Sequence, residues 1–344
     1  MFKDSLGKLT RGEDLSDAET TEFIENMRDD VINEMQIAGF LVALLMKGPS
    51  ADEIASIVRA MRANCVLINP DVEGNLTDMC GTGGGLKTFN VSSANAIMTA
   101  AAGVPVAKHG SRSISASSGS ADALEALGIN VELTPEQGER LIEEIGISFL
   151  YAPNFHPLML KVYFPELMLG VKTIFFTIIG PLINPAGAPH HLMGVYQPHL
   201  VDLVADAVTQ LDFRHVIVAH GVDGLDEISI LGPTRIAEVK GTEVVEKYEI
   251  TPEDFGMQRA SFEDVRGGDP GYNAHAINEV FAGRDTGARR DFLVLNNAFA
   301  LYVAGAVSSP EEGIKKANET IDSGRAAEKL EQFVEASHMV AAAV

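Results

Sequence analysis

The stretch DMCGTGGGLKTFNVSS, residues 78–93, directs the interpretation of the fold, because a predicted strand end leads into a glycine-rich loop and a predicted helix. Without a Cβ atom, glycine lets backbone N–H groups approach an anion, and a loop of consecutive amides before a helix forms an anion-binding nest. The loop and the side-chain donors near it are Gly81, Thr82, Gly83, Gly84, Gly85, Thr88, Asn90, Ser92 and Ser93. Neither G-x-G-x-x-G nor G-K-[ST] occurs here, which excludes a dinucleotide fingerprint and a Walker loop. For the glycines alone, a tight structural turn remains the alternative.

Composition limits the classes of partner. The 344 residues are 46% hydrophobic, enough for one large core or two modest ones, so a two-domain protein of enzyme size is expected. Asp and Glu number 48 against 26 Lys and Arg, for a net charge of -22. Such a surface repels phosphate backbones, so we expect no nucleic-acid partner, and any anion must be captured by a local site.

Targeting and redox features are weak. No apolar run reaches the roughly 18 to 20 uncharged residues of a membrane span, and the N-terminal sequence lacks the order of a signal peptide. We therefore expect a cytoplasmic protein with no membrane partner. The cysteines, Cys65 and Cys80, lack metal-ligand spacing and are interpreted as small buried hydrophobes.

The chain divides into a helical part and an α/β part. Capping-box spacing at Ser16 with Glu19 and at Ser50 with Glu53 predicts helix starts within the first 65 residues. From about residue 75, short β-like runs alternate with helical segments, which indicates an α/β domain. The expected boundaries are 1–68 for a small helical domain, rejoined by a returning segment at about 158–185, and 69–157 with 186–344 for the α/β domain.

A broad apolar helix is predicted at residues 31–48, VINEMQIAGFLVALLMKG. A helix that is apolar on most faces is either deeply buried or covered by a second subunit. Both interpretations stay open, and the second predicts a homodimer.

Two later motifs suit the same anionic ligand. Residues 107–128, AKHGSRSISASSGSADALEALG, bring Lys108 and Arg112 to a serine-rich loop before a helix near Ser120. A helix N-terminus, hydroxyl groups and a lysine together favour a phosphate or diphosphate, although Ser120 alone could be an ordinary N-cap. In HGVDGLDEIS, Asp226 and Glu227 are either solvated carboxylates or, with phosphates nearby, Mg²⁺ ligands.

These motifs, with GPLINPAG at residues 180–187, resemble in order and over nearly the whole chain those of the anthranilate phosphoribosyltransferase family. The resemblance implies an α/β fold of the nucleoside phosphorylase and phosphoribosyltransferase type: a small N-terminal helical domain, a larger α/β domain with a central mixed sheet, and a homodimer through the helical part. It implies transfer of 5-phosphoribosyl from phosphoribosyl diphosphate to an aromatic amine in tryptophan biosynthesis, and anthranilate is the first candidate for that acceptor. The alternatives are another nitrogen acceptor or a non-catalytic binding paralogue, and the latter is disfavoured by the absence of a basic stripe.

The resemblance also implies roles for individual residues. Phosphoribosyl diphosphate would bind the glycine loop, Asn90, Val91, Ser92, Ser93, Lys108 and Ser120, and two Mg²⁺ ions would be held by its phosphates with Ser92, Asp226 and Glu227. The substrate region would continue through His109, Gly110, Ser111, Arg112 and Glu166, with His109 beside the acceptor. We expect His156 to be structural and assign no catalytic side chain, because leaving-group stabilisation and positioning carry this chemistry.

The sequence departs from the family pattern in both halves of the site. Gly85 stands where the glycine loop usually has Asp, and the loop is one residue shorter, while KTIFFTIIGPL is one residue longer than its equivalent. Ser111 replaces an asparagine that contacts anthranilate. A gap-free count from His156 places Glu166 where an arginine usually meets the anthranilate carboxylate, so we expect weak anthranilate activity unless Arg112 or Lys172 supplies the cation.

Overall fold

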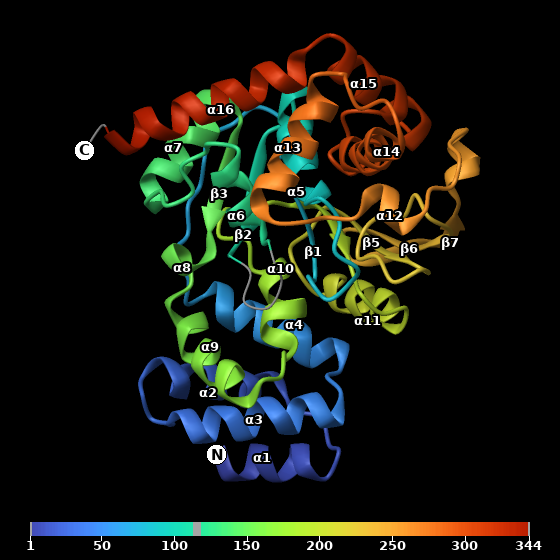
Figure 1. Cartoon of the computed structure of the whole chain (residues 1–344). Coiled ribbons are helices and arrows are strands. Elements are labelled where there is room, and N and C mark those ends of the chain that lie inside the picture. The colour runs from blue at the N-terminus through green and yellow to red at the C-terminus, as the bar shows by residue number, and fades with distance from the viewer. Residues whose placement is uncertain (1, 113–117, 343–344) are drawn as a thin grey trace.

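The computed structural model describes residues 2–112 and 118–342. A helical part lies at one end of the molecule and an α/β part at the other (Figure 1). The N-terminal helices are α1 (Phe2–Thr10), α2 (Asp17–Arg28), α3 (Glu34–Lys47) and α4 (Ala51–Arg62). Both predicted capping boxes are confirmed, at the starts of α2 and α4. Within the described residues, no helix is long and apolar enough to cross a membrane.

One mixed sheet forms the centre of the α/β part, which confirms the predicted fold class. Its strands are β1 (Thr77–Gly81), β2 (Val106–Gly110), β3 (Ile147–Tyr151), β4 (His190–Gly194), β5 (His215–Gly221), β6 (Thr234–Lys240) and β7 (Glu243–Ile250). They lie in the order β3-β2-β1-β4-β5-β6-β7; β6 runs antiparallel to both of its neighbours, β5 and β7, and all other neighbouring strands pair in parallel. The chain reverses its direction across the sheet between β1 and β4, and ligands of open α/β sheets bind outside the carboxyl ends at such a switch point.

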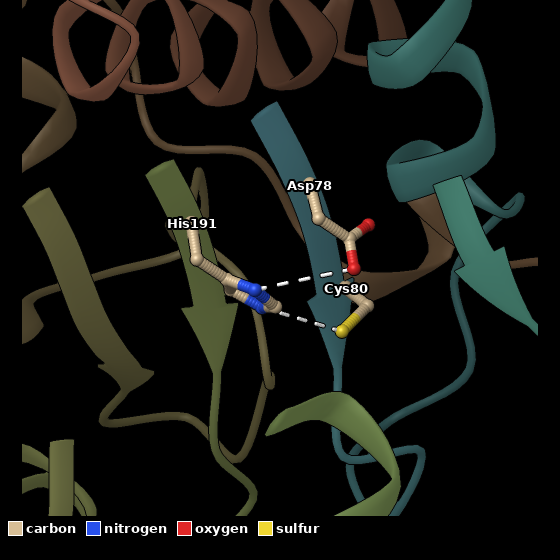
Figure 2. A group of neighbouring side chains, drawn as sticks. All are labelled: Asp78, Cys80 and His191. Atoms are coloured by element: carbon tan, nitrogen blue, oxygen red, sulfur yellow. Dashed lines mark hydrogen bonds and ion pairs between the residues drawn. The ribbon is translucent and has the colours of Figure 1, made fainter. Parts of the chain in front are cut away.

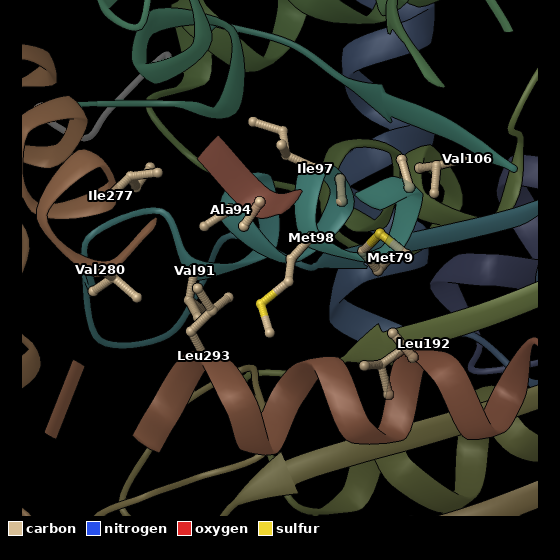
Figure 3. Close-up of a cluster of buried hydrophobic side chains, with 14 of the residues drawn as sticks. Met79, Val91, Ala94, Ile97, Met98, Val106, Leu192, Ile277, Val280 and Leu293 are labelled. Carbon is tan, nitrogen blue, oxygen red and sulfur yellow. The ribbon is translucent and has the colours of Figure 1, made fainter. Parts of the chain in front are cut away.

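Helices cover both faces of this sheet. The helices of the α/β part are α5 (Val91–Ala101), α6 (Ser120–Ala126), α7 (Pro135–Ile145), α11 (His199–Val208), α12 (Phe262–Val265), α13 (Pro270–Phe281), α14 (Ala288–Val303), α15 (Pro310–Asp322) and α16 (Arg325–Ala342), with the 3₁₀-helix η2 (Pro252–Phe255). On one face, Met79 and Leu192 from the sheet pack with Ile97 of α5 and Leu293 of α14 (Figure 3).

A second core joins the helical part to the other face of the sheet. It contains Phe40 of α3, Ile57 of α4, Val204 of α11 and Val218 of β5. The continuous core holds the helical part against the carboxyl-end region of the sheet, where the site lies.

The Met- and Phe-rich stretch returns to the N-terminal helices. It forms α8 (Ala152–Phe155), α9 (Pro157–Leu169), the π-helix η1 (Phe175–Ile179) and α10 (Gly180–Leu182). The amide of Gly180 donates to the carbonyl of Phe175, five residues earlier. A π-helix accommodates one extra residue inside a helix, so it is the local geometry that an added residue in KTIFFTIIGPL would require.

Candidate functional site

The glycine loop follows β1 and closes around the Asp226 side chain. The Gly83 amide donates to Asp226 Oδ2 over 2.6 Å, and the amides of Thr82 and Leu86 donate to the carbonyls of Gly194 and Gly224. A Cβ atom on Gly81 or Gly85 would lie 2.6 or 2.5 Å from an Asp226 carboxylate oxygen. The close approach leaves no room for a side chain at position 85 in this loop conformation. The predicted nest therefore holds a carboxylate of the protein in this structure.

Asp226 and Glu227 are not solvated carboxylates, which was one of the two interpretations that the sequence left open. Asp226 is 7% exposed, and Thr88 donates its hydroxyl to Glu227 Oε1 over 3.1 Å. Burial raises the pKa of both carboxyls, and the charge of Asp226 raises the pKa of Glu227 further. Together with the Ser92 side chain, they line a cavity of about 20 Å³ beneath the loop. Two buried carboxylates with a hydroxyl form a set of hard oxygen donors, which fits Mg²⁺.

The second motif begins at the end of β2. Lys108 is buried and donates from Nζ to the Met79 carbonyl over 2.8 Å, next to the start of the glycine loop. The Ser120 hydroxyl donates to the Ser111 carbonyl, and Gly119, not Ser120, is the N-cap of α6. Part of the serine-rich loop, residues 113–117, lies outside the described residues.

Arg112 is not directed to an acceptor carboxylate. Its guanidinium pairs with Glu125 and with Glu132, and it lies over the Tyr151 ring. Two carboxylates already neutralise this cation.

Asn90 occupies the left-handed backbone region, with φ of 62°, immediately before α5. Its Oδ1 accepts hydrogen bonds from Asn273 Nδ2 at 2.7 Å and from Ser118 Oγ at 3.0 Å. A helix of a distant part of the chain, α13, thus fixes the side chain of Asn90.

A cleft of about 800 Å³ brings these elements together between the helical part and the carboxyl ends of the strands. The predicted residues that line it are Gly81, Thr82, Gly83, Thr88, Asn90, Ser92, Lys108, His109, Gly110, Ser111, Arg112, Ser120, Glu166, Asp226 and Glu227. The predicted residues that do not line it are Gly84, Gly85, Val91 and Ser93. Val91 and Ser93 are instead fully buried at the start of α5.

Part of the cleft wall is aromatic. His109 and His156 meet edge to face with ring centroids 4.9 Å apart, and Tyr163 and Phe176, which also meet edge to face, line the cleft as well. Burial lowers the pKa of His109 well below its usual value and that of His156 to about 4, so both imidazoles are neutral near pH 7. His156, expected to be structural, is fully buried and still lines the cleft.

Glu166 lines the cleft, but its carboxylate is engaged by the chain. Glu166 Oε1 accepts from the Thr173 amide at 2.9 Å and from the Thr173 hydroxyl. Burial raises the pKa of Glu166 despite these bonds. The neighbouring Lys172 also lines the cleft, and burial together with the charge of Lys87 lowers its pKa.

The sequence analysis left Lys87 and Asn273 out of the predicted site and named Lys172 only as an alternative cation for the acceptor carboxylate. Lys87 stands inside the quoted glycine stretch and Lys172 follows the predicted returning helix, so their positions offered a signal. No sequence signal pointed to Asn273, because it donates to Asn90 from a position 183 residues away in the chain.

Comparisons with known proteins match this geometry. Residues 73–327 match the model of the glycosyl transferase family a/b domain, and residues 3–65 match its helical bundle domain. An anthranilate phosphoribosyltransferase of Acetivibrio thermocellus is 46% identical over 97% of this chain and 96% of its own. A crystal structure of the Thermus thermophilus enzyme of that name superposes with a TM-score of 0.90 at 38% identity, over 97% of this chain and 99% of its own. The structure of the Saccharomyces cerevisiae enzyme of that name, in complex with PRPP and Mg, superposes with a TM-score of 0.88 at 26% identity, over 98% of this chain and 98% of its own. The chain therefore belongs to the anthranilate phosphoribosyltransferase family.

Proposed function

We propose that the protein transfers 5-phosphoribosyl from phosphoribosyl diphosphate to the amino group of anthranilate, with Mg²⁺. The observation that carries the proposal is one cleft lined by two unlike sets of groups: buried carboxylates, hydroxyls and a lysine, and aromatic groups. Membership of the family and the PRPP and Mg complex of the yeast relative support the donor and the metal.

The donor half is assigned to the glycine loop, Asn90, Ser92, Lys108 and Ser120. The Gly83 amide, which donates to Asp226 Oδ2, would become available to the diphosphate if the Asp226 carboxylate bound Mg²⁺ instead. Lys108 lies next to the loop and neutralises charge that develops on the leaving group.

The metal ligands from the protein are assigned to Ser92, Asp226 and Glu227, and we propose two ions. Bound Mg²⁺ stabilises negative charge on the departing diphosphate. Mg²⁺ would also offset the burial that raises the pKa of both carboxyls and the charge of Asp226 that further raises the pKa of Glu227 in the metal-free protein.

The acceptor half is assigned to the wall with His109, His156, Tyr163 and Phe176. The neutral imidazoles accept hydrogen bonds from an aromatic amine, and the rings cover its faces. Lys172 supplies the cation for the anthranilate carboxylate, because Arg112 is neutralised and Glu166 is bound to Thr173. Reaction then depends on holding the amine in line with the ribose carbon as diphosphate departs.

A different nitrogen acceptor is the second candidate. Glu166 adds negative charge to this wall, and Ser111 is shorter than the family's asparagine. An acceptor without a carboxylate would not meet that repulsion.

We further propose a homodimer in the cytoplasm, with the helical and α/β domains divided as the sequence predicts. Helix α3 buries Phe40 and Leu44 on one face and exposes Met35 and Met46, at 81% and 80%, on another. On α9, Met168 is 86% exposed, and α9 packs against α3. A second copy that covers these methionines removes a contiguous apolar surface from water.

An acceptor screen tests the proposal. The protein is incubated with phosphoribosyl diphosphate, Mg²⁺ and one amine at a time, and diphosphate release is followed with anthranilate, its 3- and 4-carboxyl isomers and aniline. We expect release with anthranilate above all the others. Faster release with aniline supports the second candidate, and no release with any amine contradicts transferase function.

A further inference from the structure

Three side chains with metal-binding atoms meet at the switch point of the sheet, apart from the residues assigned to substrate and Mg²⁺. Asp78 and Cys80 are two residues apart on β1 and therefore point to the same face. His191 lies on the neighbouring strand β4, paired with Asp78 in register. Figure 2 shows the imidazole facing the carboxylate and the thiol, which lie next to each other on β1.

The spacing of the atoms suits a shared ion. Cys80 Sγ lies 3.5 Å from His191 Nε2, and Asp78 Oδ2 lies 3.9 Å from His191 Nδ1. One ligand atom from each residue falls within 4.8 Å of the others. A single ion binds one ring nitrogen, so the Cys80 Sγ to His191 Nε2 distance is the one to compare with a metal site; tetrahedral zinc with sulfur and nitrogen ligands places these two atoms roughly 3.6 Å apart.

Hydrogen bonding leaves this cluster incomplete. His191 is fully buried, yet its Nδ1 has no hydrogen-bond partner among the residues that the structure describes. Buried polar groups are normally satisfied, and an exception calls for a water or an ion. The carboxylate, in contrast, is well fixed: Asn184 donates to Asp78 Oδ2 at 2.8 Å and the Met79 amide donates to Oδ1 at 2.8 Å. Such outer hydrogen bonds are what orient carboxylate ligands in metal sites.

An ion can reach the cluster from the cleft. Cys80 is partly buried and lines both the large cleft and the cavity of about 20 Å³. Asp78 and His191 lie deeper in the sheet and are fully buried.

We propose that Asp78, Cys80 and His191 form a site for a thiophilic divalent cation of the Zn²⁺ or Cd²⁺ class, with a remaining position open to the cleft. As the metal–sulfur bond forms, the S–H bond breaks and its proton leaves to solvent, without any change of oxidation state. A carboxylate and a thiolate then balance the charge of the ion, as a buried site requires. Oxygen ligands alone serve Mg²⁺, so the thiol and imidazole select a softer ion.

Occupation of this site is expected to inhibit the transferase, a consequence that rests on the proposed function. Exchange of the thiol proton for a divalent ion adds one positive charge beside Lys108, which is held at the Met79 carbonyl. Repulsion moves the Lys108 ammonium away from its place beside the diphosphate.

Cadmium titration tests the site without relying on activity. Cd²⁺ is added to the full chain in excess Mg²⁺, and near-ultraviolet absorbance from thiolate-to-metal charge transfer is recorded for wild type, Cys80→Ala, His191→Gln and Cys65→Ala. Cys65 is the chain's other cysteine and does not belong to the cluster, so Cys65→Ala is the matched control. We expect one equivalent of Cd²⁺ in wild type and Cys65→Ala, no thiolate band in Cys80→Ala, and about tenfold or greater loss of affinity in His191→Gln.

A second measurement avoids changes to the cluster. In Cys65→Ala, stoichiometric Cd²⁺ should protect Cys80 from alkylation, followed by mass spectrometry, and a chelator selective for soft metals should restore the reaction. A thiolate band that persists in Cys80→Ala, equal affinity in His191→Gln, or alkylation of Cys80 at the same rate with Cd²⁺ would each overturn the proposal. Failure of inhibition with intact Cd²⁺ binding contradicts only the consequence for the transferase.

Discussion

Lys172 offers the sharpest test of how the acceptor is held. It lines the cleft beside Glu166, while Arg112 is occupied by Glu125 and Glu132. If its ammonium pairs with the anthranilate carboxylate, Lys172→Met removes that pair and keeps much of the side-chain volume. We therefore expect the KM for anthranilate to rise while the KM for phosphoribosyl diphosphate stays constant.

The magnitude follows from the exposure of the lysine. A hydrogen bond to a charged group contributes about 1.5 to 3 kcal/mol in a sheltered site, but Lys172 is exposed and pairs of exposed charges contribute about 0.2 to 1 kcal/mol, so we expect about 1 kcal/mol. Each 1.4 kcal/mol corresponds to a factor of about ten, so the KM should rise by roughly fivefold.

Steady-state kinetics with each substrate varied in turn provides the assay. Lys87→Met is the contrasting variant, because Lys87 donates to the Gly83 carbonyl on the donor side and should affect phosphoribosyl diphosphate instead. Lys315→Met, on α15 and away from the cleft lining, is the neutral control. An unchanged KM for anthranilate in Lys172→Met, or an equal loss with aniline, refutes the assigned pair.

Three further predictions concern metal, assembly and stability. Mg²⁺-dependent binding of phosphoribosyl diphosphate, measured by calorimetry, should weaken at least about tenfold in the double variant Asp226→Ala with Glu227→Ala; equal binding with and without Mg²⁺ would exclude these ligands. Met35→Asp should turn a dimer into a monomer by light scattering at micromolar concentration, whereas a monomeric wild type would contradict the proposed interface. Burial alone would raise the pKa of Glu238, but hydrogen bonds from His215 and other groups lower it from 4.5 to about 2. The contribution of the ionised carboxylate to the stability of the fold is therefore complete above about pH 4.5 and is lost as the pH falls toward about 2. We expect Glu238→Gln to unfold more readily than wild type at pH 7 and equally at pH 2, and a constant difference in stability across that range would contradict this linkage.

Local sequence rules predicted the helix starts and the order of the site motifs. Ser16 and Ser50 satisfy capping geometry within a few residues, which a linear pattern can express. The glycine loop and the pair Asp226 and Glu227 could likewise be predicted, because each follows the end of a predicted strand.

Contacts between distant segments could not be predicted in the same way. The occupation of the Gly83 amide by Asp226 depends on two loops folding together, and the bond of Glu166 to Thr173 depends on the turn after α9. The count that placed Glu166 in the acceptor region gave its position along the chain but not the direction of its carboxylate. The segment before GPLINPAG forms a π-helix around Phe175, a local change in winding that a count of residues does not reveal.

The central claim is tested most directly by the stoichiometry of one reaction. Wild-type protein is mixed with phosphoribosyl diphosphate, anthranilate and Mg²⁺, and anthranilate loss is measured alongside diphosphate formation. The account predicts that one diphosphate forms for each anthranilate consumed. It also predicts neither diphosphate formation nor anthranilate loss when Mg²⁺ is removed by a chelator. Diphosphate formation without loss of anthranilate, or no reaction with Mg²⁺ and both substrates present, would contradict it.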